Sequence, residues 1–574
     1  MILLRINIVK SKNAEQIYII KSFRKDGKST SKIMKKLGTM ASLLPEHNND
    51  REQVIAWAQE QARIMTEADK NDSLSLSVEF SASKQIAMNE KLLFNAGYLF
   101  LQKIFYELGL DRICSEISDA RDFQFDLTDI LAKMLYSRII HPSSKRSSFS
   151  HSLNDLESPK HDLHQVYRAL DVLAENSDFI QSAVYSNSKK LKDRNTSVLY
   201  YDCTNYFFEI EEADGLKQYG LSKEHRPNPI VQMGLFLDGD GIPLAFNIFS
   251  GNKNEQPTLI PLEKQIIHDF GLSRFIVCTD AGLASMSNRR FNTLNDRSYV
   301  VTQSLKQLKN HLKEWALDCK GWHITNDPKV YDLSKIDDEK YYDTVFFKER
   351  WINENGMEQR LIVNYSPKYK AYERSIRERQ IERAQKIVDK GASAKTRNQN
   401  SPTRFVMEHP VTKDGEIAEH ISRILDNEKI HEEECYDGFS AVCTTLDDPA
   451  SMIVSINKRR WEIEAAFRVM KSEFRARPVY VRKDERIKAH FLTCFLALLI
   501  LRILEHKLGG EYTTEEIIST LKAHSLRKID GIGYIPAFER TALTDKLHDI
   551  SGFRTDSEII TEKNMKKILK ASKK

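Results

Sequence analysis

Two aspartates of this chain lie in apolar, strand-like runs, where a charged side chain is costly. Asp202 lies within LYYDCTNYFFE and Asp280 follows RFIVCT, while a third acid, Glu464, lies in the helix-like segment RRWEIEAAFRVMK. An isolated carboxylate inside a sheet costs several kcal/mol unless a positive group meets it. Three such acids predict a shared divalent cation, as in a metal-dependent phosphoryl-transfer site. The alternative for each acid is a satisfied carboxylate at a solvent-facing position.

The hydrophobic pattern changes its period near residue 196. Between 85 and 190, apolar residues recur at i, i+3 and i+4, which predicts helices. From 196 the period becomes two in SVLYYDCTNYFFEI, IVQMGLFLD and IPLAFNIFS, and DGDG at 238–241 indicates a hairpin turn. A helix over 258–270 then leads to RFIVCTD, so we expect this strand to lie parallel to an earlier one. Asp280 would then lie at the carboxyl end of its strand, where α/β sheets bind ligands.

Positive charge is segregated along the 574 residues, although the formal net charge is only +5. Residues 1–38 hold ten Lys and Arg against two acids, residues 368–397 hold ten against four, and residues 458–488 hold eleven against five. Such segregation is typical of a protein with a polyanion partner, since phosphate contacts release counterions. For 368–397, a solvated helix with ion pairs is an equally good interpretation.

Three features bear on the cellular location. The seven cysteines form no CxxC pair and no His/Cys cluster with zinc spacing, which favours a reducing, cytoplasmic setting. The start of the sequence, MILLRINIVK, is too short and too charged to predict a signal peptide. The longest apolar run, 491–501, is shorter than the ~20 residues that span a bilayer, so we expect a buried core helix there.

The surroundings of Glu464 guide the interpretation of the third acid. Arg460 precedes it by four residues, Arg468 follows it by four, and Lys471 follows it by seven. Helix geometry places all of these side chains near one face. On a generic helix this pattern favours a salt-bridge ladder. The same face would also serve a site that holds a metal with the acid and DNA phosphates with the cations.

These motifs resemble the DDE transposases of bacterial insertion sequences, specifically the insertion-sequence-four superfamily with its YREK signature. Arg460, Glu464 and Lys471 stand at the spacings of that signature, whereas its Tyr position is occupied by Asn457. Further matches are YYDCTNYFFE around Asp202, the segments at 220–238 and 241–259, CTDAG at 278–282 and RPVYVRKDERIKAHFLTCFLALLI at 477–500, with a weaker extension into HPSSKRSSF at 141–149. The resemblance spans roughly 196–508 and looks closest to the branch numbered sixteen thirty-four.

The resemblance implies an α/β fold in which an RNase H-like mixed sheet is flanked by helices, with a mostly β insertion domain and an N-terminal helical region. The expected domains are a basic hairpin and helix at 1–70, a helical DNA-binding region at 71–195, the catalytic core at 196–300 and 449–510, the insertion at 301–448 and a helical tail at 511–574.

The resemblance also implies the chemistry. Asp202, Asp280 and Glu464 are the expected catalytic residues and the ligands of two Mg²⁺ ions, with Mn²⁺ as a substitute. A water and then a 3′ hydroxyl would attack a phosphodiester at the transposon end. The expected DNA contacts are Arg460, Lys471, Arg468, Asn457, Arg226 and Lys223. For Arg226 and Lys223, a solvated loop is an equally good interpretation.

The implied partners are double-stranded DNA, both as the terminal inverted repeats of a transposon and as target DNA, and a second copy of the chain, so that a homodimer forms in the DNA complex. No membrane partner is expected. The implied location is the bacterial cytoplasm, on nucleoid DNA when bound. Two alternatives stay open: an RNase H-like nuclease that cuts without strand transfer, and a domesticated DNA-binding protein. The intact acids argue against the second.

Four other residues have interpretations of their own. Glu255 either assists metal binding or caps the following helix, and capping is favoured. His490 is expected to be a hydrogen-bonded core histidine. Trp322 and Trp351 are expected in the core of the insertion, although some relatives stack an aromatic from that domain on a flipped base.

Overall fold

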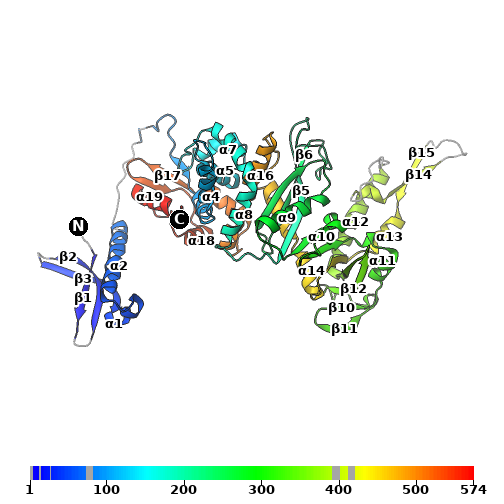
Figure 1. Cartoon of the computed structure of the whole chain (residues 1–574), viewed down its shortest axis with the longest axis horizontal. Helices are drawn as coiled ribbons and strands as arrows, with labels where there is room; N and C mark the ends of the chain where they lie inside the picture. The colour runs from blue at the N-terminus through cyan, green and yellow to red at the C-terminus, as the bar shows by residue number, and fades with distance from the viewer. Residues whose placement is uncertain are drawn as a thin grey trace. The chain divides into compact units, whose positions relative to one another are not determined.

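The chain forms two compact units in the computed structural model, Met1–Glu90 and Lys91–Lys574 (Figure 1). The structure describes residues 4–11, 14–25, 28–72, 82–83, 85–390, 401–411 and 420–574. The first unit consists of β1 (Leu4–Lys10), β2 (Glu15–Lys25), β3 (Lys28–Thr39), the short α1 (Met40–Leu43) and the long α2 (Arg51–Asp72).

One face of the small antiparallel sheet β1-β2-β3 packs against α2. Ile6 and Ile17 share a core with Val54 of the helix, because alternate residues of a strand lie on the same face. The hairpin expected in this segment thus has a third strand. β3 is difficult to recognise from sequence, since KSTSKIMKKLGT lacks the apolar alternation of a half-buried strand.

A ten-stranded mixed sheet forms the centre of the second unit, in the order β11-β10-β12-β13-β16-β9-β8-β5-β6-β7. In one half of it, β5, β6 and β7 form an antiparallel meander, and β8 and β9 run parallel to β5. This is the expected RNase H-like arrangement, so the predicted fold class is confirmed. The strands of this half are β5 (Val198–Phe207), β6 (Ile230–Leu237), β7 (Pro243–Ser250), β8 (Ile276–Thr279) and β9 (Ser298–Gln303).

Helices cover both faces of this half of the sheet. On one face, Leu262 of α9 (Leu259–Asp269) shares a core with Tyr201 of β5. On the other face, α15 (Trp461–Lys471) and α16 (Asp484–Lys507) share a core with Tyr200 and Tyr206. Successive residues of β5 therefore enter different cores, as expected for a strand that is buried on both sides.

The insertion continues the same sheet, because β16 pairs with β9 and β13 pairs with β16. Its strands in the large sheet are β10 (Trp322–Ile324), β11 (Asp327–Tyr331), β12 (Phe346–Glu354), β13 (Met357–Tyr365) and β16 (Phe439–Thr444). Around it lie α10 (Met286–Phe291), α11 (Asn310–Leu317), α12 (Pro367–Asp389), α13 (Asn427–Glu434) and the hairpin of β14 (Val406–Val411) and β15 (His420–Leu425).

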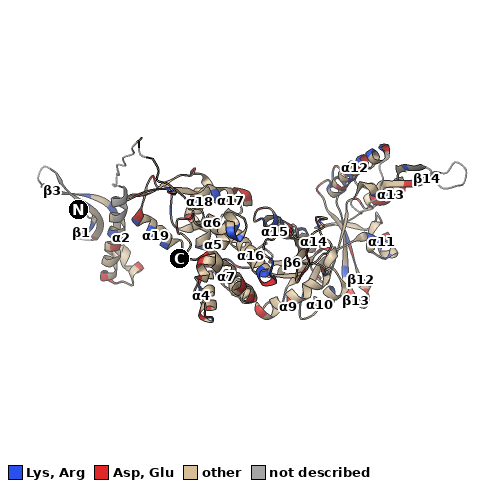
Figure 2. Cartoon of the chain, turned by 90° about the horizontal axis from the view of Figure 1, so that it is seen from above, with Lys and Arg blue, Asp and Glu red and all other residues tan. Residues whose placement is uncertain are grey.

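The basic segment 368–397 falls mostly in α12, where Lys and Arg are mixed with Asp and Glu (Figure 2). Lys370 pairs with Asp338 at 2.8 Å, and the buried Arg377 pairs with Asp437. These ion pairs favour the interpretation of a solvated helix that is tied to its own domain. Residues 391–397 of the segment lie outside the described residues.

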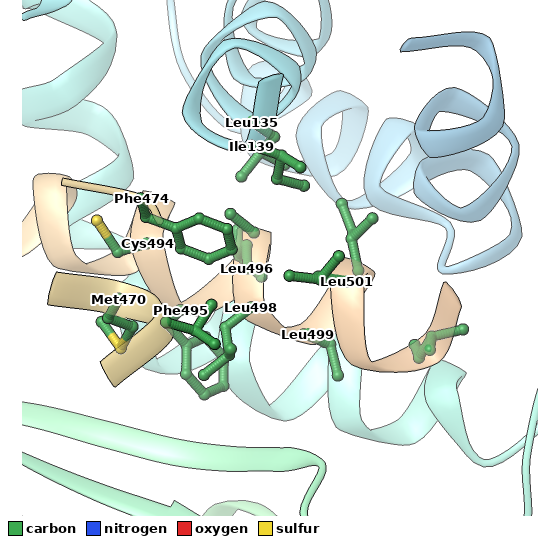
Figure 3. Packing of buried hydrophobic residues seen from close by; sticks show 14 of the residues in the cluster. Leu135, Ile139, Met470, Phe474, Cys494, Phe495, Leu496, Leu498, Leu499 and Leu501 are labelled. Atoms are coloured by element: carbon green, nitrogen blue, oxygen red, sulfur yellow. The ribbon is translucent and has the colours of Figure 1, made fainter. Parts of the chain in front are cut away.

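The helix α16 is the centre of the helical region. Leu135 and Ile139 of α5 face the leucines of α16, and Met470 and Phe474 approach from α15 and the residues after it (Figure 3). Among the described residues, α16 is the one helix long and apolar enough to cross a membrane, but 89% of its apolar window is buried inside the protein. The predicted buried core helix is thus confirmed. The other helices here are α3 (Tyr98–Glu107), α4 (Leu110–Asp119), α5 (Leu127–Ile140), α6 (Lys145–Ser152), α7 (Leu163–Glu175) and α8 (Ser177–Ser188), whereas α14 (Ala450–Lys458) packs against β8 and β9 of the large sheet.

The last 65 residues hold strands as well as the expected helices. A four-stranded sheet has the order β19-β18-β17-β4, so β4, some 430 residues earlier in the sequence, pairs with β17. Strands this short give no periodic signal, which is why sequence alone does not reveal them. The elements are β4 (Leu93–Asn95), α17 (Thr514–Ala523), β17 (Ser525–Ile529), β18 (Gly533–Pro536), α18 (Ala542–Ser551), β19 (Ile560–Thr561) and α19 (Glu562–Ala571).

Candidate functional site

Asp280, which directly follows β8, lies beside Asp202 in the middle of the neighbouring parallel strand β5. In the register of β5 and β8, Tyr200 lies opposite Cys278, and the same offset carried two residues further brings Asp202 opposite Asp280. Burial raises the pKa of Asp202 to about 6, and the negative charge of Asp280 contributes to the rise. The two acids are therefore close enough to interact, as the strand pattern predicted.

Asp202 has little direct compensation for its charge. Its Oδ1 accepts a hydrogen bond from the backbone N–H of Cys203 at 2.7 Å, and no ion pair to it occurs in the described part of the chain. Asp280 caps the turn that follows its strand, because its Oδ1 accepts a hydrogen bond from the N–H of Leu283 at 3.0 Å. Each carboxylate thus keeps oxygen lone pairs free for another ligand.

Lys223 lies in an exposed loop, but its side chain reaches back to the strand beside Asp202. Its Nζ donates to the carbonyl oxygen of Cys203 at 2.6 Å and pairs with Glu255 Oε1 at 2.9 Å. Burial lowers the pKa of Lys223, but the charges of Asp202 and Glu255 outweigh burial, so the pKa is raised overall. The favoured cap role of Glu255 is wrong: it stands at the N-cap position, yet its side chain makes no cap hydrogen bond and pairs with Lys223 instead.

Lys471 approaches the same strand from α15. Its Nζ donates to Thr204 Oγ1 at 2.6 Å. Burial, together with the nearby charge of Lys223, lowers the pKa of Lys471 to about 8, while Asp202 acts in the opposite direction. Two lysines therefore flank Asp202. Thr204 was missed in the sequence, although it lies two residues from Asp202 and so shares its face of β5.

Glu464 is linked to the pair of aspartates through Arg460. Arg460 Nη2 lies 3.4 Å from Glu464 Oε1, and the positive charge of Arg460 lowers the pKa of Asp202 against the effect of burial. The Glu464 side chain is 59% exposed. The three carboxylates do not form a tight cluster, because their ligand atoms do not all lie within 4.8 Å of one another.

In the described part of the chain, one group of acidic and histidine residues does bring its ligand atoms within 4.8 Å of one another. It comprises Asp545, His548 and Asp556 of the C-terminal region. Both of its aspartates already pair with Arg554 at 2.7 Å, so its charge is compensated within the protein.

The donor set around Asp202 nevertheless fits a divalent cation. Asp202, Asp280 and Glu464 offer carboxylate oxygens, which are the hard ligands that Mg²⁺ and Mn²⁺ prefer. The pKa of Asp202 lies well above its usual value because burial is not offset by a direct ion pair. A cation between these acids would remove that penalty.

The structure does not bring the other predicted DNA contacts to the acids. Arg468 lines a separate cavity of about 510 Å³ with Trp461. Asn457 turns toward the sheet, where its Oδ1 accepts a hydrogen bond from Thr302 Oγ1 at 3.1 Å. Arg226 lies over the ring of Phe207, 4.1 Å from its centre, at the far end of β5. Their roles in DNA binding stay predictions.

Three core predictions have different outcomes. Trp322 is fully buried, as expected. His490 is buried and its Nε2 lies 3.1 Å from the carbonyl oxygen of Ala476, so the core histidine is also confirmed. Trp351 is 51% exposed on β12, so its predicted core position is wrong.

Comparison with known proteins identifies the family of the central region. Residues 207–500, just over half of the chain, match the family model described as "Transposase DDE domain". The matched range contains Asp280 and Glu464 and begins shortly after Asp202. No curated protein matches the chain.

Two solved transposase structures align with the chain at low similarity. The cryo-EM structure of a piggyBac transposase synaptic complex with hairpin DNA is 10% identical, with a TM-score of 0.35, over 74% of this chain and 79% of that chain. The Mos1 transposase paired-end complex with the left transposon end is 14% identical, with a TM-score of 0.14, over 42% of this chain and 66% of that chain. Such scores add nothing to the assignment.

Proposed function

This chain belongs to the family of the transposase DDE domain, and on that premise we propose that it cleaves DNA at insertion-sequence ends and transfers the cut strands to a target. The observation that carries the proposal is the pair of aspartates on the neighbouring strands β5 and β8, with Lys223, Lys471 and Arg460 around Asp202. We further propose membership of the insertion-sequence-four superfamily, on the spacing of Arg460, Glu464 and Lys471.

The acids would bind metal, and the cations would bind DNA phosphates. Asp202, Asp280 and Glu464 would hold two divalent cations, Mg²⁺ or Mn²⁺, which lower the pKa of an attacking water or hydroxyl and stabilise the leaving oxygen. Lys223 and Lys471 are fixed on β5 by hydrogen bonds to Cys203 and Thr204. Their ammonium groups would hold phosphate oxygens of the strand that is cut.

Arg460 would also keep the Glu464 carboxylate in an ion pair until DNA binds. In this structure its guanidinium pairs with the Glu464 carboxylate. A DNA phosphate is a better bidentate partner for arginine than one carboxylate oxygen at 3.4 Å. Binding of DNA would therefore draw Arg460 away and leave Glu464 free to act as a ligand.

The substrates we propose are duplex DNA with transposon terminal inverted repeats and a duplex target, bound by a homodimer in the cytoplasm. The first unit supports this proposal, since residues 1–38 carry ten Lys and Arg against two acids. A cluster of cations gives DNA affinity without sequence preference, and that affinity falls with salt.

A strand-transfer assay tests the proposed function. Purified protein would be incubated with duplexes that carry the inverted repeats flanking its coding region, a target plasmid and Mg²⁺. We expect joined products, and none when EDTA replaces Mg²⁺. Cleavage without joining would indicate the nuclease instead. DNA binding without cleavage in either Mg²⁺ or Mn²⁺ would indicate the domesticated DNA-binding protein.

A further inference from the structure

Cationic side chains from three separate segments surround a small cavity next to the start of α6. Arg138 comes from α5, Lys145 from the first turn of α6, and Arg475 from the segment between α15 and α16. Ser143 and Tyr480 complete much of the lining. These residues fall in or near the segment HPSSKRSSF and the segment RPVYVRK, two motifs to which the acid site gives no role.

Lys145 is a buried cation without a partner. It is only 6% exposed, and its ammonium group makes no hydrogen bond or ion pair among the described residues. Burial, followed by the charge of the neighbouring Arg138, lowers the pKa of Lys145 to about 7. A buried, uncompensated ammonium group is unfavourable, and proteins rarely keep one without a function.

Arg138 is a second buried cation whose hydrogen-bond donors are only partly satisfied. It is 3% exposed, its Nη1 donates to the carbonyl oxygen of Phe474 at 3.0 Å, and its Nε has no hydrogen-bond partner. Two buried cations therefore line one cavity, and no carboxylate lines it with them. His490, which also lines the cavity, stays neutral because burial holds its pKa well below the usual value.

The start of α6 adds further positive potential. The helix begins at Lys145, directly after its cap residue Ser144, so its first amides and its dipole favour an anion at this end. The enclosed volume is about 10 Å³, which admits one oxygen atom and not a whole phosphate group. An anion would thus bind at the mouth with one oxygen inserted between the buried cations.

The mouth of the cavity belongs to the same stretch of chain as the acid site. Arg475 follows Lys471 by four residues, and both Arg475 and Tyr480 are exposed. Since four residues span at most ~14 Å of chain, one DNA molecule is long enough to contact both Lys471 and Arg475.

We propose that Arg138, Lys145 and Arg475 form a binding site for one backbone phosphate of the DNA strand that is held at the acid site. The identity of the anion as DNA rests on the proposed function, whereas the cation pocket itself rests on burial and on missing partners. Its role would be to fix the register of the strand, since phosphate contacts position DNA without reading its sequence.

A DNA-binding titration of the full chain in EDTA tests this site independently of catalysis. The variants are Lys145→Met and Arg475→Ala, and the matched control is Lys264→Met, which removes one exposed positive charge from α9 on the opposite face of the sheet. We expect Lys145→Met and Arg475→Ala to bind a duplex end roughly tenfold more weakly and to reduce the salt slope by about one. We expect Lys264→Met to bind as the wild type does.

The outcomes separate the pocket from the proposed function. If Lys145→Met is folded and binds DNA with the affinity and salt slope of the control, the pocket is overturned. If Lys145→Met does not fold, the exposed Arg475→Ala decides alone, and unchanged binding overturns the proposal. If the wild type binds DNA but never joins ends, while both variants bind weakly, the pocket holds and the transposase proposal fails. A wild type that does not bind DNA would overturn both.

Discussion

Lys133 and Lys145 are equally buried, at 6% exposure each, but their surroundings differ completely. Lys133 of α5 pairs with Asp155 at 2.9 Å and donates to the carbonyl oxygen of Glu157 at 2.5 Å. Lys145, a short distance along the chain, has neither kind of partner among the residues that the structure describes, and its pKa is lowered by burial and by Arg138. The first lysine holds two segments together, whereas the second is left as a potential binding group.

The aspartates show the same division. Asp437 is 8% exposed and forms two hydrogen bonds with Arg377, which ties α12 to the residues before β16. Asp202 has no ion pair within the described part of the chain, and its pKa is raised because burial outweighs the charges around it. Ion pairs thus account for the buried charges of Lys133 and Asp437, whereas Lys145 and Asp202 lie at the two sites proposed here.

The largest expected effect is at the unpaired acids. Asp202→Ala, Asp280→Ala and Glu464→Ala should each abolish DNA cleavage, because the metals would lose a ligand, while binding to DNA ends stays close to normal. Gel assays of cleavage and binding on the same preparations measure both. Cleavage in Mg²⁺ by any one of the variants would remove that residue from the site.

The next largest expected effect is a difference in stability between variants of Lys133 and Lys145. Lys133→Met should lower the free energy of unfolding by about 3–5 kcal/mol, because it leaves Asp155 buried and unpaired. Lys145→Met should leave the free energy of unfolding unchanged or raise it, because this substitution leaves no described acid buried and unpaired. Denaturant unfolding of both variants measures the difference. Equal losses of stability would mean that Lys145, like Lys133, stabilises the fold through a partner.

Arg460→Ala and Lys471→Ala should lower strand transfer about a hundredfold, since a phosphodiester misplaced by ~1 Å costs about that factor in rate. Metal binding should persist, because neither side chain is a metal ligand. If these residues only form a helix ladder, the loss would be roughly 0.2–0.5 kcal/mol in stability, with nearly normal activity. Strand-transfer rates and melting temperatures on the same variants decide between the two accounts.

A smaller effect is expected from pH. The pKa of Asp202 without a cation is about 6, so at subsaturating Mg²⁺ protons should compete with the cation as the pH falls through 6 and reduce cleavage about tenfold per unit. Because the folded pKa lies above the ordinary value of 3.8, protonated Asp202 contributes stability that is complete below about 4 and is lost as pH rises through 6. A pH profile with Asp202→Asn as the stability control checks both signs. Cleavage independent of pH from 5 to 7 would contradict the shifted pKa.

The sequence was informative about the sheet edge and less so about side-chain directions. The period-two pattern and the crossover helix predict that the strands of Asp202 and Asp280 run parallel in one sheet, and β5 and β8 do pair in this way. Arg468 was placed on the face of Glu464, but a helical position fixes the Cβ direction and not the end of a long side chain. Asn457 belongs to α14, which ends before α15 begins, so it cannot continue the face of Glu464.

Lys145 was not recognised from sequence for a related reason. HPSSKRSSF is polar and is typical of an exposed segment. Its burial depends on α5 and on residues 474–490, which lie more than 300 positions later and pack against it only in the folded chain. Long-range packing of this kind leaves no local pattern.

Because β4 pairs with β17, the four-stranded sheet can form only late in the synthesis of the chain. Phe94 lies opposite Leu526, and Gln102 of α3 donates to Ser572 at 2.8 Å. A ribosome that adds about 5–20 residues per second needs on the order of half a minute or more between these partners. Throughout that interval the α3 segment has no completed sheet beside it. The helical region therefore closes only after the catalytic sheet has emerged, and a chain interrupted before residue 526 cannot form it.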